Sequence, residues 1–260
     1  MGWWGTIIGG ALGWMLGGPL GALLGAVLGH GLSGAAQAGW TGAGTERVQA
    51  AFFTATFSVM GHIAKADGRV SEAEIRATRA VMAHMNLNAD QQHAAIGLFE
   101  QGKRADFPLD AVLAQLHQEC GGQATLLRMF LQIQLHAAFA DGALHPAEQA
   151  IFNRICAALG ISQAELRQHE DFVRSQHGFG GGQAATARPD KLAAAYRTLG
   201  VSADVDDAGI KRSYRRLMTE NHPDKLVAKG LPEEMITLAQ EKVQQINVAY
   251  DVIKAARGIK

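Results

Sequence analysis

The first 44 residues contain no Asp, Glu, Lys or Arg, and this uncharged stretch most constrains how the chain can fold. Its apolar run from Ile7 to Leu32 is 26 residues long, whereas a helix needs only about 20 residues to cross a bilayer. Glycine is a poor helix former in water, but a backbone in lipid must satisfy its own hydrogen bonds and therefore favours a helix. The pattern predicts a transmembrane anchor over residues 1–32 and a linker over residues 33–49.

Glycine is spaced regularly within this run. Six glycines recur at every fourth position, namely Gly9, Gly13, Gly17, Gly21, Gly25 and Gly29. Four residues advance the stripe by only about 40° around a helix, so these positions form a slowly winding groove. Small residues at such spacing let a second helix approach closely. We therefore expect a homodimer or small homo-oligomer formed through this helix, with a kink or joint at Pro19.

Two other interpretations of the segment compete with a retained anchor. Ala36-Gln37-Ala38 is similar to the cleavage site of a signal peptide, although no Lys or Arg precedes the apolar run and the run is longer than usual. Alternatively, the glycine-striped helices could form a membrane oligomer or pore that does the work of the protein. In that case function would survive deletion of residues 190–260.

Residues 50–175 have the pattern of a helical domain with an internal repeat. The spacing of Phe52, Phe53, Phe57, Met60 and Ile63 predicts one buried helix face. The segment over residues 66–74 recurs 74 residues later, over residues 140–148, and each copy lies between two helical patterns. We expect two helix–turn–helix corners. Ser71 and Glu74 would cap the helix after the first corner, and His145 and Pro146 would begin the helix after the second.

The corners also contain carboxylates that could bind a metal ion. These candidates are Asp67, Glu72, Glu74, Asp141 and Glu148. The first half of an EF-hand loop is missing, which excludes a standard calcium site. The repeated acidic corner resembles the TerB-like domain of tellurite-resistance and membrane-associated stress proteins, and that resemblance keeps open a metal-responsive stress sensor. Because helix capping explains the same carboxylates, we expect no metal site.

Charge and cysteine content exclude several classes of protein. Lys+Arg and Asp+Glu number 24 each, so no overall charge favours nucleic acid. Cys120 and Cys156 form no CxxC motif, and we expect two buried thiols in a reducing compartment, although they could pair if the chain were exported. No nucleophile–base–orienter set or phosphate-binding loop is present in the sequence. We therefore expect no enzymatic activity and no cofactor.

Beyond a glycine-rich linker over residues 176–190, residues 191–260 contain three helical patterns. The first runs from Leu192 to Leu199, the second begins near Asp206 or Asp207, and the third covers about Pro232 to Arg257. Two long helices joined by a short loop can pack antiparallel, with the short helix crossing them. The second helix carries two basic i,i+4 pairs, and this small cluster without interleaved aromatic residues does not favour nucleic acid.

The loop between the long helices carries the most specific motif. His222-Pro223-Asp224-Lys225 lies between the basic helix and an Ile246-Asn-Val-Ala-Tyr250 helix, and the whole module resembles a J-domain. One departure is Val243, where many J-domains have Phe. The resemblance implies docking on a DnaK-type chaperone and stimulation of its ATPase. The implied partner-binding residues are Lys211, Arg212, Tyr214, Arg215, Arg216, His222, Pro223, Asp224 and Lys225.

The order of the three parts resembles the DjlA-type membrane-anchored, DnaJ-like co-chaperones. The resemblance implies an all-α protein with a transmembrane helix, a TerB-like domain and a J-domain hairpin. It also implies a single-pass protein of the bacterial inner membrane, with the N-terminus periplasmic and the bulk cytoplasmic. Its partners would be a DnaK-type chaperone and membrane lipid, and its role would include envelope-stress and capsule signalling.

Overall fold

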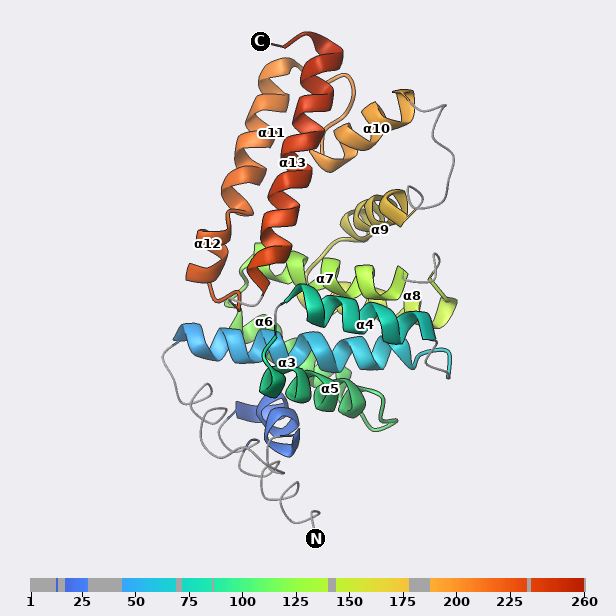
Figure 1. Ribbon diagram of the computed structural model, residues 1–260, viewed down its shortest axis with the longest axis vertical. Helices are drawn as coiled ribbons and strands as arrows, with labels where there is room; N and C mark the ends of the chain where they lie inside the picture. Colours follow the sequence, from blue (N-terminus) through green and yellow to red (C-terminus); the bar gives the residue numbers. More distant parts are fainter. Residues whose placement is uncertain are drawn as a thin grey trace.

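The computed structural model describes residues 13, 17–27, 44–68, 72–85, 87–139, 144–177, 188–232 and 235–259. These residues are helical or form turns and loops, and no strand occurs among them, which confirms the predicted all-α class. Figure 1 shows two groups of helices along the long axis of the molecule. We call α3–α9 the central domain and α10–α13 the C-terminal module.

The central domain is built around α3. Its helices are α3 (Gly44–Ala64), α4 (Glu72–His84), α5 (Ala89–Gly102), α6 (Leu109–Glu119), α7 (Ala124–Ala138), α8 (Pro146–Leu159) and α9 (Gln163–His177). Helix α3 packs against α5, α6 and α7, and most of its second half is buried. The buried hydroxyls of Thr56 and Ser58 donate to the carbonyls of Phe52 and Thr54, both at 2.7 Å, so polar side chains are tolerated there.

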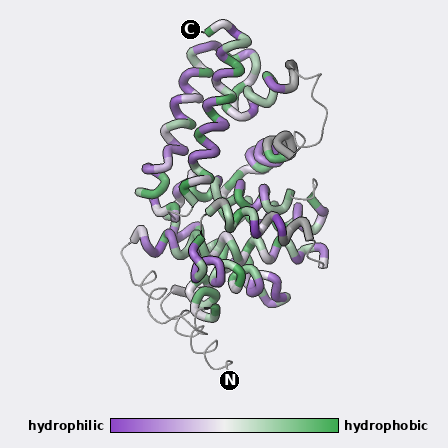
Figure 2. Tube along the Cα trace, in the orientation of Figure 1, coloured by the Kyte–Doolittle hydropathy of each residue, from purple (hydrophilic) through white to green (hydrophobic). Residues whose placement is uncertain are grey.

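The predicted apolar face of α3 forms the centre of the core. Phe52, Phe57, Met60 and Ile63 are buried, and Phe53 packs against them from the edge. The Phe52 and Phe130 rings meet edge to face, with centroids 6.1 Å apart. In Figure 2 the hydrophobic stretches concentrate in these central helices, whereas α11 carries long hydrophilic stretches.

The second repeated corner starts α8 as the sequence predicts. His145 is the N-cap: its Nδ1 accepts from the Ala147 amide at 3.3 Å, and Pro146 occupies the first turn. The Glu148 carboxylate accepts from the His145 amide at 2.7 Å, which completes a capping box. In the first corner, Ser71 lies outside the described residues. The carboxylate of the second corner therefore has a structural role as a helix cap.

The described part of the N-terminal segment is a helix over residues 17–27 that packs on the central domain. Leu20 and Leu24 are buried in the central core. The Gln115 side chain accepts from the Leu20 amide at 2.8 Å and donates to the Gly17 carbonyl at 2.5 Å. Gly18 has a left-handed φ of +60° directly before Pro19, which is consistent with the predicted joint.

None of the helices described here has both the length and the apolar character needed to cross a bilayer.

The C-terminal module is a helical hairpin with a crossing helix. It comprises α10 (Arg188–Thr198), α11 (Asp207–Glu220), α12 (Pro223–Ala228) and α13 (Ile236–Arg257). Helices α11 and α13 run antiparallel and α10 crosses them (Figure 1). Their shared core contains Leu199, Ile210, Ile246 and Ile253, each completely buried. Three details differ from the sequence prediction: α10 begins four residues before Leu192, a short helix, α12, follows the loop, and α13 begins at Ile236 rather than near Pro232.

Candidate partner-binding site

The His222–Asp224 loop is held by hydrogen bonds at a helix start. Helix α11 ends at Glu220, and His222 is the N-cap of α12, with its Nδ1 accepting from the Asp224 amide at 3.3 Å. Pro223 occupies the first helical position, where a missing N–H costs nothing. The side chains of His222 and Asp224 are 52% and 90% exposed. The loop therefore presents an imidazole and a carboxylate to solvent on a defined backbone.

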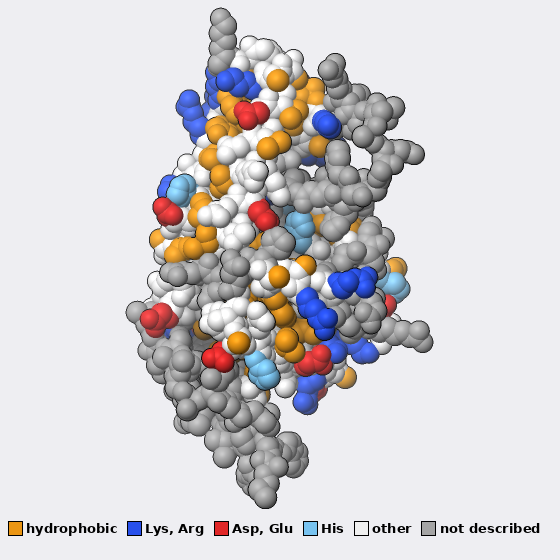
Figure 3. Space-filling model, in the orientation of Figure 1, with side chains coloured by type: hydrophobic (Ala, Val, Ile, Leu, Met, Phe, Trp, Pro, Cys, Tyr) orange, Lys and Arg blue, Asp and Glu red, His pale blue; other side chains and the backbone are white. Residues whose placement is uncertain are grey.

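The basic residues of α11 lie on the helix that leads into this loop. Arg212, Arg215 and Arg216 are exposed, and Lys211 is half-buried. Two of these arginines have long carboxylate contacts: Arg212 lies 3.8 Å from Asp206, and Arg216 lies 3.8 Å from Glu220. Exposed pairs of this kind contribute little to stability. Figure 3 shows Lys and Arg side chains along the outer edge of the C-terminal module on the face viewed.

Tyr214 differs from the other predicted partner-binding residues because it is part of the hairpin interface. Its ring stacks on Tyr250, with centroids 4.2 Å apart and planes 17° apart. Its hydroxyl donates to Asn247 Oδ1 at 2.8 Å. The ring is half-buried, so its main observed role is to hold α11 against α13.

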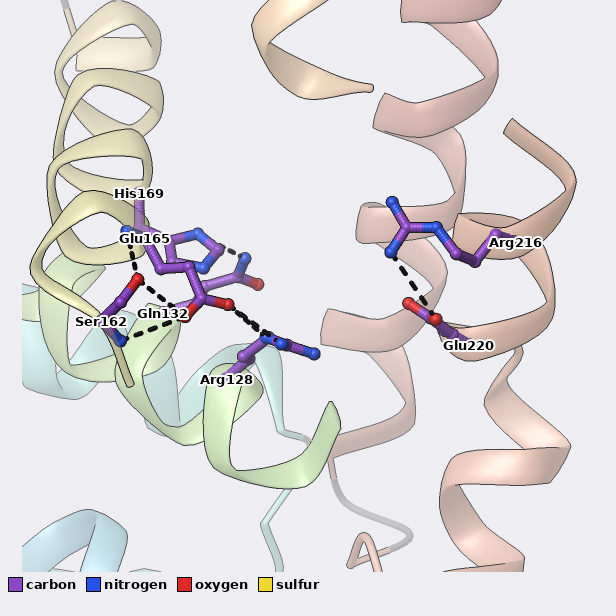
Figure 4. Close-up of polar contacts among 7 residues, drawn as sticks. All are labelled: Arg128, Gln132, Ser162, Glu165, His169, Arg216 and Glu220. Atoms are coloured by element: carbon purple, nitrogen blue, oxygen red, sulfur yellow. Dashed lines mark hydrogen bonds and ion pairs between the residues drawn. The ribbon is translucent and has the colours of Figure 1, made fainter. Parts of the chain in front are cut away.

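A cleft of about 250 Å³ lies between the C-terminal module and the central domain. Residues from α7, α9, α11 and α13 line it, and they include Arg128, Glu165, Arg216 and Glu220. Glu165 pairs with Arg128 at 2.9 Å on one side, and Glu220 pairs with Arg216 on the other. Figure 4 shows each carboxylate beside the arginine of its own side. Each of these two ion pairs thus lies on one side of the cleft.

Burial lowers the pKa of two basic side chains in the cleft wall. Desolvation lowers the pKa of His169 to about 4, and Gln132 Nε2 donates to its Nδ1 at 3.0 Å (Figure 4). Desolvation also lowers the pKa of Lys242 to about 8. This cleft could not be predicted from the sequence, because nothing in the residue pattern places α9 beside α10 and α11.

Among the described residues, the candidate metal-binding carboxylates do not form a cluster. Within the described ranges, no group of three or more His, Cys, Asp or Glu side chains could hold a metal ion. Glu148 is engaged in its cap, Asp141 lies outside the described residues, and the side chains of Glu72 and Glu74 are not described. Gly9 and Gly29 of the stripe also lie outside the described residues.

Cys120 and Cys156 are free and buried, as predicted. Burial raises the pKa of each thiol to about 12, which makes both unreactive.

Comparison with protein families defines the class. The family described as "DnaJ domain" matches residues 194–258, and "Tellurite resistance protein TerB" matches residues 53–171. "Co-chaperone DjlA transmembrane domain" matches residues 1–35. The helical hairpin, its exposed loop and these matches define a co-chaperone with a J-domain and a TerB-like domain.

Individual relatives narrow this class to one family. The chain is 44% identical over 238 residues to the "Co-chaperone protein DjlA" of Photobacterium profundum, which covers 85% of each chain. It is 45% identical over 227 residues to that of Vibrio parahaemolyticus, covering 82% of this chain and 80% of the relative. It is 46% identical over 222 residues to that of Photorhabdus laumondii, covering 82% and 81%. The chain therefore belongs to the DjlA co-chaperone family. No solved structure gives a significant match.

Proposed function

We propose that the chain stimulates the ATPase of a DnaK-type chaperone through the J-domain, residues 191–260. The observation that carries the proposal is the exposed His222–Asp224 loop at the end of a basic helix, within a segment that matches the DnaJ domain. The chain would act as a regulator, and ATP hydrolysis would take place on the partner.

The geometry suggests how such a contact would work. Arg212, Arg215 and Arg216 give α11 a positive face that would steer an acidic surface of the partner into place. The loop is already ordered by its N-cap hydrogen bond and by Pro223, so little conformational entropy is lost when it binds. Lys225 is exposed on the next turn and would extend the same contact.

The N-terminal segment would place this activity at the bacterial inner membrane. The match of residues 1–35 to the DjlA transmembrane domain supports a lipid-embedded anchor. A partner of DnaK type in the cytoplasm would require the bulk of the chain there and the N-terminus in the periplasm. The glycine stripe supports association of two or more copies, and we connect this assembly to envelope-stress and capsule signalling.

The test measures ATP hydrolysis by a purified DnaK-type chaperone with the full chain in lipid nanodiscs. Wild type is expected to raise the rate several-fold, and His222→Gln is expected to lose at least nine-tenths of that increase because it removes the imidazole from the loop. The matched control is His93→Gln, since His93 is exposed on α5 of the central domain. Failure of folded wild-type protein to stimulate the chaperone would refute the proposal.

A further inference from the structure

The segment that follows the His222–Asp224 loop is anchored in the core of another domain. Leu226, Leu231, Met235 and Ala239 are completely buried, and all four belong to the apolar cluster of the central domain. The J-domain has a separate core of its own. The loop thus has a J-domain helix on one side and a segment anchored to the central domain on the other.

The described part of residues 226–239, which we call the anchoring segment, packs closely against α3. Gly230 has a φ of +102°, and a side chain there would overlap Val48 of α3, so only glycine allows this approach. Gln123 Nε2 also donates to the carbonyl of Lys229 at 3.4 Å, which ties the turn after α12 to the start of α7.

The rest of the boundary between the two domains is polar and partly open. The cleft separates α11 from α7 and α9, and two of its ion pairs, Arg128–Glu165 and Arg216–Glu220, each lie on one side of it (Figure 4). At the far end, Gln168 Nε2 donates to the Arg197 carbonyl at 3.1 Å. Burial of apolar surface is the main stabilising term in such contacts. The attachment is therefore concentrated at α12 and the start of α13.

Helix α12 has only six residues, too few to be stable in water without packing. Its first turn contains the hydrogen bond from the Asp224 amide to His222 Nδ1. Whatever keeps α12 folded also keeps the loop ordered.

We propose that the central domain positions the His222–Asp224 loop for its partner, with Val48 and Leu226 as positioning residues on the two sides of the contact. This inference rests on the proposed function. When the contact is intact, the partner meets an ordered loop. When it is lost, the partner must order α12 as it binds, and the apparent affinity falls.

The experiment compares Val48→Asp with Thr45→Asp in the full chain in nanodiscs. Both substitutions add one negative charge near the start of α3, but Val48 is buried and Thr45 is exposed. Hydrogen exchange reports docking through two amides: Leu226 donates to the His222 carbonyl at 3.1 Å, and Leu231 donates to the Leu226 carbonyl at 2.9 Å. Titration of the co-chaperone against ATPase rate gives the concentration for half-maximal stimulation.

We expect Val48→Asp to speed exchange at both amides and to raise the half-maximal concentration about five- to tenfold, with an unchanged maximal rate. Thr45→Asp should match wild type. A second pair tests the other side of the contact: Leu226→Ala should behave like Val48→Asp, and the bulkier Leu226→Met should restore the wild-type value.

The outcomes separate this inference from the proposed function. If wild type fails to stimulate the chaperone, the proposed function fails. If wild type stimulates and the two amides exchange faster in Val48→Asp, yet the half-maximal concentration is unchanged, the positioning role is wrong. A lower half-maximal concentration would also overturn it, because the docked state would then restrain the J-domain.

Discussion

At the scale of single residues, His169 links the stability of the fold to acidity. Its pKa is lowered by burial to about 4, from an ordinary value of 6.5. Between these values the unfolded chain binds more protons than the folded chain, so stability falls as pH decreases from 6.5 toward 4. A shift of this size contributes at most about 2 kcal/mol of lost stability at pH 5 relative to pH 7.

The pH effect can be measured by urea unfolding of the wild type and of His169→Gln at pH 7 and pH 5. Glutamine cannot titrate, so the variant should lose roughly 1–2 kcal/mol less stability between the two pH values than wild type does. Equal losses in the two proteins would show that His169 is not the group that senses acid.

The sequence was a good guide to residues whose role depends on local spacing. The cap formed by His145 and Glu148 follows from neighbouring residues, and the structure shows it. The loop motif, which also depends on spacing, lies within the segment that matches the DnaJ domain. The burial of His169 could not be predicted, because it depends on α9 facing a helix pair from another part of the chain.

At the scale of helices, α11 depends on the N-cap residue that precedes it. Asp206 is the N-cap, and its carboxylate accepts from the Gly209 amide at 2.8 Å. Asp206→Ala removes this bond and the favourable charge at the helix start, and should cost about 1 kcal/mol of stability. Urea unfolding measures the loss. The control, Asp251→Ala on the exposed surface of α13, should stay within about 0.5 kcal/mol of wild type. Two variants of equal stability would argue that the cap contributes nothing.

Helix α12 shows why the sequence predicted some elements and missed one. A proline after a helical pattern ends that helix, so the sequence pattern alone predicts only that Pro223 stops the preceding helix. Proline is equally suited to begin a helix, and here it does both, with His222 as the new cap. The choice is made by burial of Leu226 against the central domain, and local residue preferences do not contain that information.

At the scale of the whole molecule, two glycines of the stripe form a close contact within the chain. Gly13 and Gly21 pack against each other within the chain, since a side chain at either position would overlap the backbone of the other. The spacing of glycines predicts a close approach, but it cannot specify whether the partner is the same chain or a second copy.

Association between copies is tested at a glycine outside this internal contact. We expect Gly25→Leu to reduce cross-linking of the full chain in lipid vesicles by at least half, because the side chain fills the groove. Ala26→Leu adds bulk on a neighbouring face of the same helix and should leave cross-linking unchanged. Wild-type cross-linking in Gly25→Leu would exclude the stripe as the contact between copies.

The burial of Leu226, Leu231, Met235 and Ala239 has a practical consequence for anyone who shortens the chain. A cut between residues 177 and 188 follows the apparent boundary in the sequence but divides one apolar core between two fragments. The J-domain fragment would expose an apolar surface directly beside His222. Such an exposed apolar surface binds non-specifically to other apolar surfaces and to other copies of the fragment. Binding measured with that fragment would therefore mix recognition by the loop with adhesion that the intact protein does not show.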